Sequence, residues 1–181
     1  ILPAIPPGTA LQLSNGTTVR YAQLFKCEQV LRSDCNRGVS GIDGSTSTAA
    51  GAACVGEEMT VLITGDMSFS YDVNGLSSTY LSPRFKIIVM CNGGGGIFRF
   101  IKPTSDLPEL ETCFEIHRDI SVEKYADLFG LRYFELNDEK SAAEVLSLFF
   151  AEKDRPAILA VHTPNVYNAE VLRGYFRRSR Q

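Results

Sequence analysis

The chain has 181 residues, of which 44% are hydrophobic and 22% are charged, and its formal net charge is −3. This length suits one large domain or two small ones, and the composition excludes disorder, collagen and coiled coil as the main state. The weak negative charge argues against nucleic-acid or membrane-surface binding. No apolar run reaches the length of about 18 residues that a membrane span needs.

The first seven residues, ILPAIPP, are apolar and rich in proline, and they lack the charged start of a signal peptide. We therefore interpret residues 1–10 as a linker remnant of a longer chain and residues 11–181 as one domain. The five cysteines form no C-x-x-C pair, and the chain has only two histidines, so neither a zinc site nor a disulfide framework is expected. Free thiols indicate a reducing, cytoplasmic compartment.

The hydrophobic pattern predicts helices that alternate with strands. A helix capped by Thr17 or Thr18 is expected to run to about Arg32, and a glycine-rich loop follows it. The other expected helices cover residues 45–55, 67–78, 121–129, 141–152 and 168–177. The expected strands cover residues 59–64, 85–90, 131–136 and 156–161. Segment 102–119 contains two prolines and is expected to be irregular.

The expected strands are mostly apolar throughout instead of alternating with polar residues, which is typical of a parallel sheet with both faces covered. We therefore expect an α/β fold, a three-layer sandwich with a mostly parallel sheet. Ligands bind such sheets beyond the carboxyl ends of the strands. Three segments are expected there: the loop DCNRGVSGIDG (34–44), the pair Gly65-Asp66, and the glycine run that follows Asn92.

Asp66 follows one buried strand, and Asn92 follows the next, 26 residues later. One strand–helix–strand crossover fits this spacing, so both side chains are expected at the same edge of the sheet. A carboxylate, an amide oxygen and a glycine carbonyl would form a partial shell of oxygen ligands, which Mg²⁺ completes with phosphate oxygens and water. Two simpler interpretations stay open: Asp66 caps a helix, and Gly93–Gly96 is a mobile surface loop.

Gly65-Asp66-Met67 and Cys91-Asn92 resemble the diphosphate-binding signature of thiamine diphosphate enzymes, Gly-Asp-Gly followed after one crossover by Asn-Asn. Met67 and Cys91 depart from that signature. From about Ser14 onward the chain is similar to the MenD family. The segments that carry this similarity are NRGVSGIDG (36–44), STAAG (47–51), GDMSFSYDVNGL (65–76) and NGGGGIF (92–98).

The resemblance implies the thiamine diphosphate-binding fold and the C-terminal domain of a bacterial, cytoplasmic synthase. That enzyme would join 2-oxoglutarate, with decarboxylation, to isochorismate in menaquinone biosynthesis. Its cofactors would be thiamine diphosphate and Mg²⁺, with Mn²⁺ as an alternative ion. A pyrimidine-binding domain of the same protein, in a homodimer or homotetramer, would supply the catalytic glutamate. We expect no catalytic residue in this domain, and we expect the isolated domain to be inactive.

The resemblance also implies roles for single residues. The metal ligands would be Asp66, Asn92 and the carbonyl of Gly94. The cofactor-binding residues would be Arg37, Ile42, Asp66, Ser68, Asn92 and Gly94, with Ile42 bending the cofactor. The substrate-binding residues would be Arg20, Arg37, Ile97, Phe98 and Ile101, with Arg20 binding a carboxylate. Gly16 stands where the family usually has serine.

Two other functions stay open at this point. The chain could belong to another thiamine diphosphate-dependent enzyme, such as a 2-oxo acid decarboxylase or an acetolactate synthase-like enzyme. It could also be a non-catalytic cofactor-binding subunit. The segment NRGVSGIDG (36–44) together with Arg20 favours the MenD family.

Overall fold

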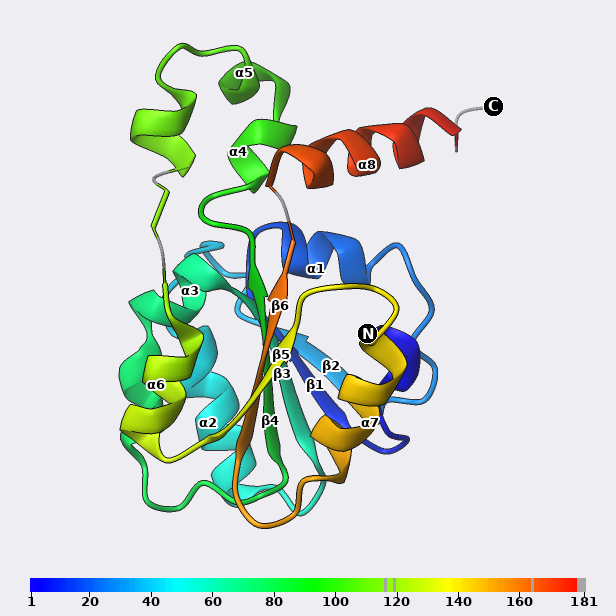
Figure 1. Ribbon diagram of the computed structural model, residues 1–181, viewed down its shortest axis with the longest axis vertical. Helices are drawn as coiled ribbons and strands as arrows, with labels where there is room; N and C mark the ends of the chain where they lie inside the picture. The colour runs from blue at the N-terminus through cyan, green and yellow to red at the C-terminus, as the bar shows by residue number, and fades with distance from the viewer. Residues whose placement is uncertain (116, 119, 164, 179–181) are drawn as a thin grey trace.

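The computed structural model of the protein describes residues 1–115, 117–118, 120–163 and 165–178 (Figure 1). One six-stranded sheet forms its centre, with the strand order β2-β1-β3-β4-β6-β5, and the strand pairs are parallel. The strands are β1 (Ala10–Leu13), β2 (Arg32–Cys35), β3 (Thr60–Gly65), β4 (Phe85–Cys91), β5 (Arg132–Leu136) and β6 (Ala157–His162). The expected α/β fold with a parallel sheet is confirmed.

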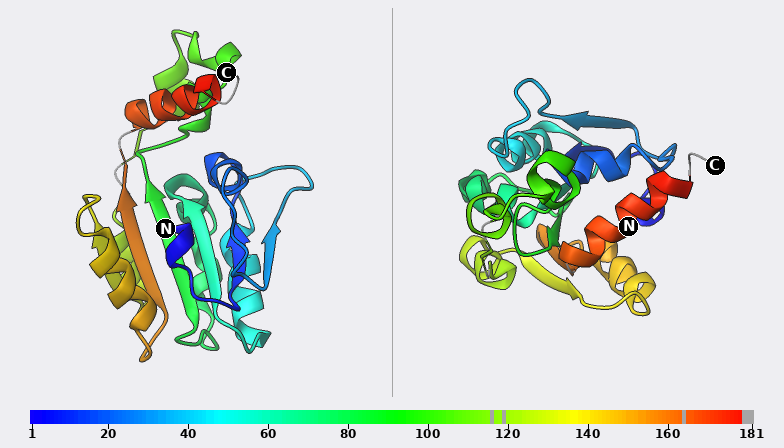
Figure 2. Two further views of the ribbon diagram at one scale, coloured as in Figure 1. Left: turned by 90° about the vertical axis from the view of Figure 1, so that its right-hand side faces the viewer. Right: turned by 90° about the horizontal axis from the view of Figure 1, so that it is seen from above.

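Helices cover both faces of the sheet (Figures 1 and 2). One face carries α2 (Ser45–Val55), α3 (Asp66–Tyr71), the short helix η2 (Val73–Ser77) and α6 (Val122–Phe129). The other carries η1 (Leu2–Ala4), α1 (Thr17–Ala22) and α7 (Ala142–Ala151). The expected cap of α6 is confirmed, because Ser121 Oγ accepts a hydrogen bond from the N–H of Lys124 at 3.3 Å.

Successive residues of the central strands divide the core between the two faces, because side chains alternate along a strand. In β3, Leu62 packs into the cluster that holds the alanines of α2, whereas Val61 and Ile63 pack into the cluster under α7. These three side chains are at most 6% exposed. Burial on both faces explains why the sequence of this strand is one continuous apolar run.

Two expectations for the first forty residues were wrong. The helix that begins at Thr17 ends at Ala22 instead of near Arg32, and its N-cap is Gly16, without a side-chain cap. Cys27 and Val30, which suggested helical spacing, pack from a loop against the core. β1 and β2 were not predicted, because β1 has only four residues and β2 is an edge strand with mostly exposed side chains.

The first residues pack onto the body of the domain. Ile5 is 2% exposed and shares a core cluster with Leu11 of β1 and Phe149 of α7. Thr9 Oγ1 donates a hydrogen bond to the carbonyl of Pro6 at 2.7 Å. Part of the segment 1–10 therefore packs into the core of the domain, and the domain boundary at residue 10 stays a prediction.

A separate group of helices stands above the carboxyl edge of the sheet (Figure 2). It consists of α4 (Ile97–Phe100), α5 (Lys102–Ser105), the π-helical turn η3 (Leu110–Glu115) and α8 (Asn165–Arg178). Segment 102–119 is thus less irregular than expected, with residues 116 and 119 outside the described part. We call this group the upper helices. Among the described residues, no helix is long and apolar enough to cross a bilayer.

Lys86 of β4 has a fully buried side chain, which is unusual for a lysine. Its Nζ donates a hydrogen bond to the carbonyl of Glu152 at 2.7 Å and lies 6.0 Å from the ring centre of Phe149. Burial lowers the pKa of Lys86 to about 8, and the negative charge of Glu152 acts in the opposite direction. Compared with an exposed lysine, this pKa means that the buried side chain is destabilised by about 3 kcal/mol in its charged form.

Replacing Lys86 by methionine is therefore expected to raise the free energy of unfolding at pH 7 by about 1–2 kcal/mol, after the loss of one hydrogen bond. Between pH 8 and 10.5 the unfolded chain binds more protons at Lys86, so the unsubstituted protein gains stability as pH rises. The advantage of the variant should shrink over that window. Urea unfolding from pH 7 to 10.5 measures both effects, with exposed Lys124→Met as the control. If the difference in the free energy of unfolding between K86M and the unsubstituted protein does not change with pH, the lowered pKa of Lys86 is contradicted.

Candidate functional site

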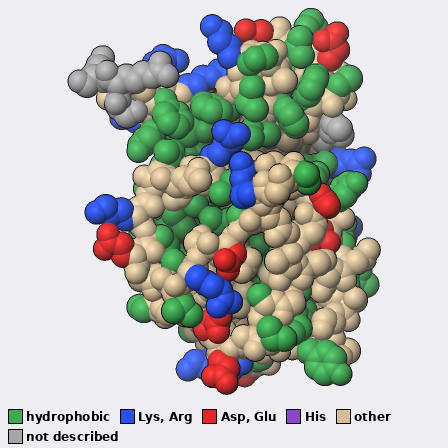
Figure 3. Space-filling view, turned by 180° about the vertical axis from the view of Figure 1, so that it is seen from behind, with side chains coloured by type: hydrophobic (Ala, Val, Ile, Leu, Met, Phe, Trp, Pro, Cys, Tyr) green, Lys and Arg blue, Asp and Glu red, His purple; other side chains and the backbone are tan. Residues whose placement is uncertain are grey.

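A cavity of about 490 Å³ lies beyond the carboxyl ends of β3 and β4, below the upper helices. Its lining includes all ten residues that the sequence pointed to, which are Arg20, Arg37, Ile42, Asp66, Ser68, Asn92, Gly94, Ile97, Phe98 and Ile101. From behind, hydrophobic side chains gather where the upper helices meet the body, with Lys or Arg side chains among them (Figure 3). The topology thus brings together residues that lie up to 81 positions apart. Their binding roles stay predictions.

Asp66 occupies the first position of α3, directly after β3, and is 3% exposed. Its Oδ2 accepts hydrogen bonds from the N–H groups of Asn92 at 3.0 Å and Gly93 at 2.7 Å, and its Oδ1 accepts one from Met67 at 2.8 Å. Burial raises the pKa of Asp66, and the backbone N–H groups, with Gly93 first, act in the opposite direction. Asp66 thus joins two strand ends and does more than cap its own helix.

The glycine run after Asn92 is bound to Asp66, because the N–H groups of Asn92 and Gly93 both donate to its carboxylate. Gly93 and Gly94 have φ angles of 81° and 151°, in a region that residues with a Cβ rarely adopt. The N–H of Gly94 donates to Asn92 Oδ1 at 3.3 Å, and the carbonyl of Gly93 lies 3.0 Å from Nδ1 of His117. These contacts give the run a defined conformation, so it is not a free surface loop.

The donor set around Asp66 fits a hard divalent cation bound to a diphosphate. A buried carboxylate, the amide of Asn92 and the backbone of Gly94 line the same cavity and offer oxygen ligands. Among the described residues, no group of three or more His, Cys, Asp or Glu side chains could hold a metal. An ion at Asp66 would therefore take its other ligands from amide, carbonyl, phosphate or water oxygens, as Mg²⁺ commonly does.

Asn15, two residues after β1, holds the loop of residues 36–44 beside the cavity. It is 5% exposed, and its Nδ2 donates hydrogen bonds to the carbonyls of Asn36 at 2.7 Å and Gly41 at 2.6 Å. Its Oδ1 accepts one from Nη1 of Arg37 at 2.8 Å. The amide of Asn15 therefore fixes both the path of this loop and the guanidinium of Arg37.

Ile42 and Ser68 are linked across the cavity wall. The hydroxyl of Ser68 donates to the carbonyl of Ile42 at 2.7 Å, and the Ile42 side chain remains 39% exposed. Ser68, which is 3% exposed, thus anchors the residue expected to bend the cofactor. A diphosphate contact by Ser68 stays a prediction, and its hydroxyl hydrogen is already directed at Ile42 in this structure.

The remaining predicted residues line the cavity from α1 and from α4. Arg20 is an exposed residue of α1, and Ile97, Phe98 and Ile101 belong to α4 and the residue after it. A cationic group therefore lies in the same cavity as apolar side chains. This combination suits a substrate that carries carboxylates on a hydrophobic ring or chain.

Sequence reasoning missed several lining residues, among them Asn15, Met90, Phe114 and Glu115. Asn15 directly precedes Gly16, the position at which the family usually has serine. Ser14, which also precedes Gly16, is fully buried and accepts a hydrogen bond from the N–H of Gly65 at 3.3 Å. It therefore joins β1 to β3 and does not line the cavity.

Cys91 replaces the first asparagine of the signature, and its side chain packs against the core cluster on the α2 face. Burial, followed by the negative charge of Asp66, raises the pKa of Cys91 to about 12. At neutral pH it is a thiol and not a reactive thiolate. In the described part of the chain all five cysteines are free, as expected.

Comparison with known proteins places this site in a family. Residues 15–161 match the family "Thiamine pyrophosphate enzyme, C-terminal TPP binding domain". Three similar curated proteins are named 2-succinyl-5-enolpyruvyl-6-hydroxy-3-cyclohexene-1-carboxylate synthase. They come from Porphyromonas gingivalis (47% identity, 97% of this chain and 31% of the relative), Flavobacterium johnsoniae (42%, 98% and 32%) and Christiangramia forsetii (41%, 95% and 30%).

The chain spans about a third of the length of these curated relatives. The family match covers the loop of residues 36–44, the β3–α3 junction and the glycine run, which all line the cavity. It therefore agrees with the geometry of Asp66 and Asn92. The chain belongs to the thiamine pyrophosphate enzyme family and matches its C-terminal TPP-binding domain.

Proposed function

We propose that this chain is the C-terminal domain of a thiamine diphosphate-dependent synthase of menaquinone biosynthesis. The synthase would join 2-oxoglutarate, with loss of carbon dioxide, to isochorismate. One observation carries the proposal: the donor set at Asp66 and Asn92 shares a cavity with Arg20, Arg37 and the apolar residues of α4, in a chain 41–47% identical to synthases of that name. Thiamine diphosphate, when bound, supplies the means to stabilise the carbanion that decarboxylation leaves.

The residues of this domain would bind and orient the reactants. Asp66, Asn92 and the Gly94 carbonyl would hold Mg²⁺, which anchors the diphosphate. Ile42 would hold the cofactor in a bent shape, because it reaches into the cavity from a loop fixed by Ser68 and Asn15.

Two guanidinium groups would provide the recognition of carboxylates. Both proposed substrates carry carboxylates, and an arginine fork pairs with a carboxylate in bidentate geometry. Arg20 lines the cavity from α1 and Arg37 from the loop of residues 36–44, so they can bind carboxylates at two points of the cavity. The side chains of Ile97, Phe98 and Ile101 would pack on the apolar parts of the substrates.

The proposed enzyme needs a second domain. The glutamate that activates the cofactor would come from a pyrimidine-binding domain of the same protein, in a homodimer or homotetramer. Residues 1–10 would then be the segment that joins the C-terminal domain, residues 11–181, to the rest of the chain. The free thiols of this chain favour a cytoplasmic enzyme.

Calorimetry and a turnover assay on the natural full-length polypeptide test the proposal. We expect binding of thiamine diphosphate that requires Mg²⁺, and consumption of 2-oxoglutarate only when isochorismate is present. The 181-residue chain alone should not turn over these substrates. Absence of magnesium-dependent cofactor binding by the full-length protein would overturn the proposal.

The same assay separates the alternatives. Turnover of pyruvate or another 2-oxo acid without isochorismate would assign the protein to the decarboxylases or the acetolactate synthase-like enzymes. Cofactor binding without turnover of any of these acids would indicate a non-catalytic subunit. We expect neither result, because the identity to the named synthases extends over 95–98% of the chain.

A further inference from the structure

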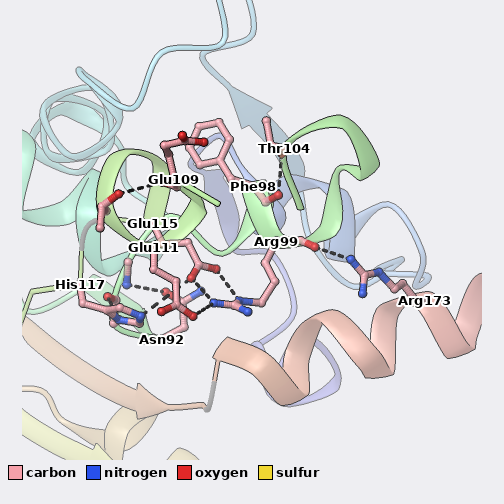
Figure 4. A network of polar contacts seen from close by, with 12 residues as sticks. Asn92, Phe98, Arg99, Thr104, Glu109, Glu111, Glu115, His117 and Arg173 are labelled. Atoms are coloured by element: carbon pink, nitrogen blue, oxygen red, sulfur yellow. Dashed lines mark hydrogen bonds and ion pairs between the residues drawn. The ribbon is translucent and has the colours of Figure 1, made fainter. Parts of the chain in front are cut away.

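Glu115 is a fully buried carboxylate at the end of η3, outside the metal-ligand set described above. Arg99 of α4 binds it with a two-pronged geometry, in which Nε donates to Oε1 at 2.7 Å and Nη2 donates to Oε2 at 2.5 Å (Figure 4). Hydrogen bonds to the two glutamates raise the pKa of Arg99, Glu115 first and Glu111 second. A buried pair with this geometry fixes α4 and η3 against each other.

The backbone of Glu115 also holds the glycine run. Its carbonyl accepts a hydrogen bond from the N–H of Gly95 at 2.8 Å. Two residues further on, His117 contacts the carbonyl of Gly93 at 3.0 Å. On its other side the run is bound to Asp66, through the N–H groups of Asn92 and Gly93. Gly94, whose carbonyl is the proposed metal ligand, therefore lies between two anchors.

The glycine run and η3 lie so close together that there is no room for a side chain at Gly95. A Cβ at Gly95 would come within 2.7 Å of the carbonyl oxygen of Phe114 and 2.9 Å of the ring of Phe98. A shift of η3 must therefore be passed on to the glycine run. The same unit is tied to α8, because Nη2 of Arg173 donates to the carbonyl of Arg99 at 2.5 Å.

We propose that the Arg99–Glu115 ion pair is a clamp that positions the Gly94 carbonyl for the metal and holds α4 over the substrate side of the cavity. Arg99 and Glu115 act as positioning residues, and neither needs to touch the metal. The inference rests on the proposed function of the site, since it assumes that Mg²⁺ and thiamine diphosphate bind beside Asp66. It goes beyond that function because it assigns the position of the Gly94 carbonyl to Arg99 and Glu115, which are not metal ligands.

The test compares Glu115→Gln with Glu111→Gln in the natural full-length protein. Both glutamates contact the Arg99 guanidinium, but Glu111 has a 67% exposed side chain, and none of its hydrogen bonds described here reaches the glycine run. We expect E115Q to raise the dissociation constant for thiamine diphosphate in saturating Mg²⁺ by about tenfold or more, as loss of an outer support of a metal site does. E111Q should stay within about twofold of the parent protein.

Calorimetry gives the affinities, and thermal unfolding without cofactor gives the stability of each variant. A pair that only stabilises the fold would lower the melting temperature in E115Q and leave cofactor affinity of the folded protein unchanged, and this outcome would overturn the clamp. If E115Q does not fold, Gly95→Ala decides, because it displaces the same run without removing a charge. Unchanged affinity in that variant would also overturn the clamp.

The parent protein separates this inference from the proposed function. If the parent does not bind the cofactor, the proposed function fails. If the parent and E115Q bind it equally well, only the clamp fails. Recovery of affinity in Glu115→Asp relative to E115Q would further support a role for the carboxylate itself.

Discussion

Replacing Asp66 by asparagine is expected to weaken binding of thiamine diphosphate in the presence of Mg²⁺ by about 100-fold or more. The substitution keeps the volume of the side chain and one acceptor oxygen, and it removes the negative charge that a hard cation requires. Asp66 is the only carboxylate among the three proposed ligands. Calorimetric titration of the full-length protein with thiamine diphosphate, at fixed Mg²⁺, measures the change.

Asp72→Asn provides the matched control. Asp72 follows α3 and accepts hydrogen bonds from the N–H and the hydroxyl of Ser47, at 2.8 and 2.7 Å, outside the lining of the cavity. That variant should lose some stability and keep its cofactor affinity. If D66N and D72N bind the cofactor equally well, the metal assignment at Asp66 is wrong.

The environment of Asp66 also fixes the direction of a pH effect on binding. Burial raises the pKa of Asp66, so its carboxylate takes up a proton at a higher pH than an exposed aspartate does. A proton and a metal ion compete for this group. Cofactor affinity should therefore fall on acidification, and in D66N this part of the pH dependence should be absent.

Much of the sheet and the centre of the site could be predicted from the sequence, because local patterns carry them. A continuous apolar run predicts a strand covered on both faces, and β3 and β4 each have one. Two such strands joined by one crossover are adjacent and parallel, so the residues that follow them must meet at one edge. The hydrogen bond from Asn92 to Asp66 is the direct result.

Other features could not be predicted, because they depend on contacts between distant segments. β2 has a polar sequence and becomes a strand only by pairing with β1. Asn15 and Glu115 have no local signal: the first binds a loop more than 20 residues away, and the second binds an arginine 16 residues away. From sequence alone a polar residue is expected at the surface, and only the fold shows that it is buried and hydrogen-bonded.

Replacing Asn15 by alanine is the second large effect that we expect, and it tests the loop of residues 36–44. The variant leaves the carbonyls of Asn36 and Gly41 without their present donor and releases Arg37 from its acceptor. Loss of these bonds at a buried position should lower the free energy of unfolding by about 2 kcal/mol. Because Ile42 and Arg37 then lose their fixed positions, cofactor affinity should fall about tenfold as well.

Gln12→Ala separates the two effects of this substitution. Gln12 lies in β1, three residues before Asn15, and is 6% exposed. It joins β1 to β2, because its Nε2 donates a 3.0 Å hydrogen bond to Asp34 Oδ2. It does not line the cavity. Q12A should lose stability and retain cofactor affinity, whereas N15A should lose both in calorimetry and urea unfolding. An N15A protein that is destabilised but binds the cofactor as tightly as the parent would show that Asn15 supports the fold alone. In that case the loop must keep its position at the cavity through the 2.7 Å hydrogen bond between Ser68 and Ile42, which ties it to α3.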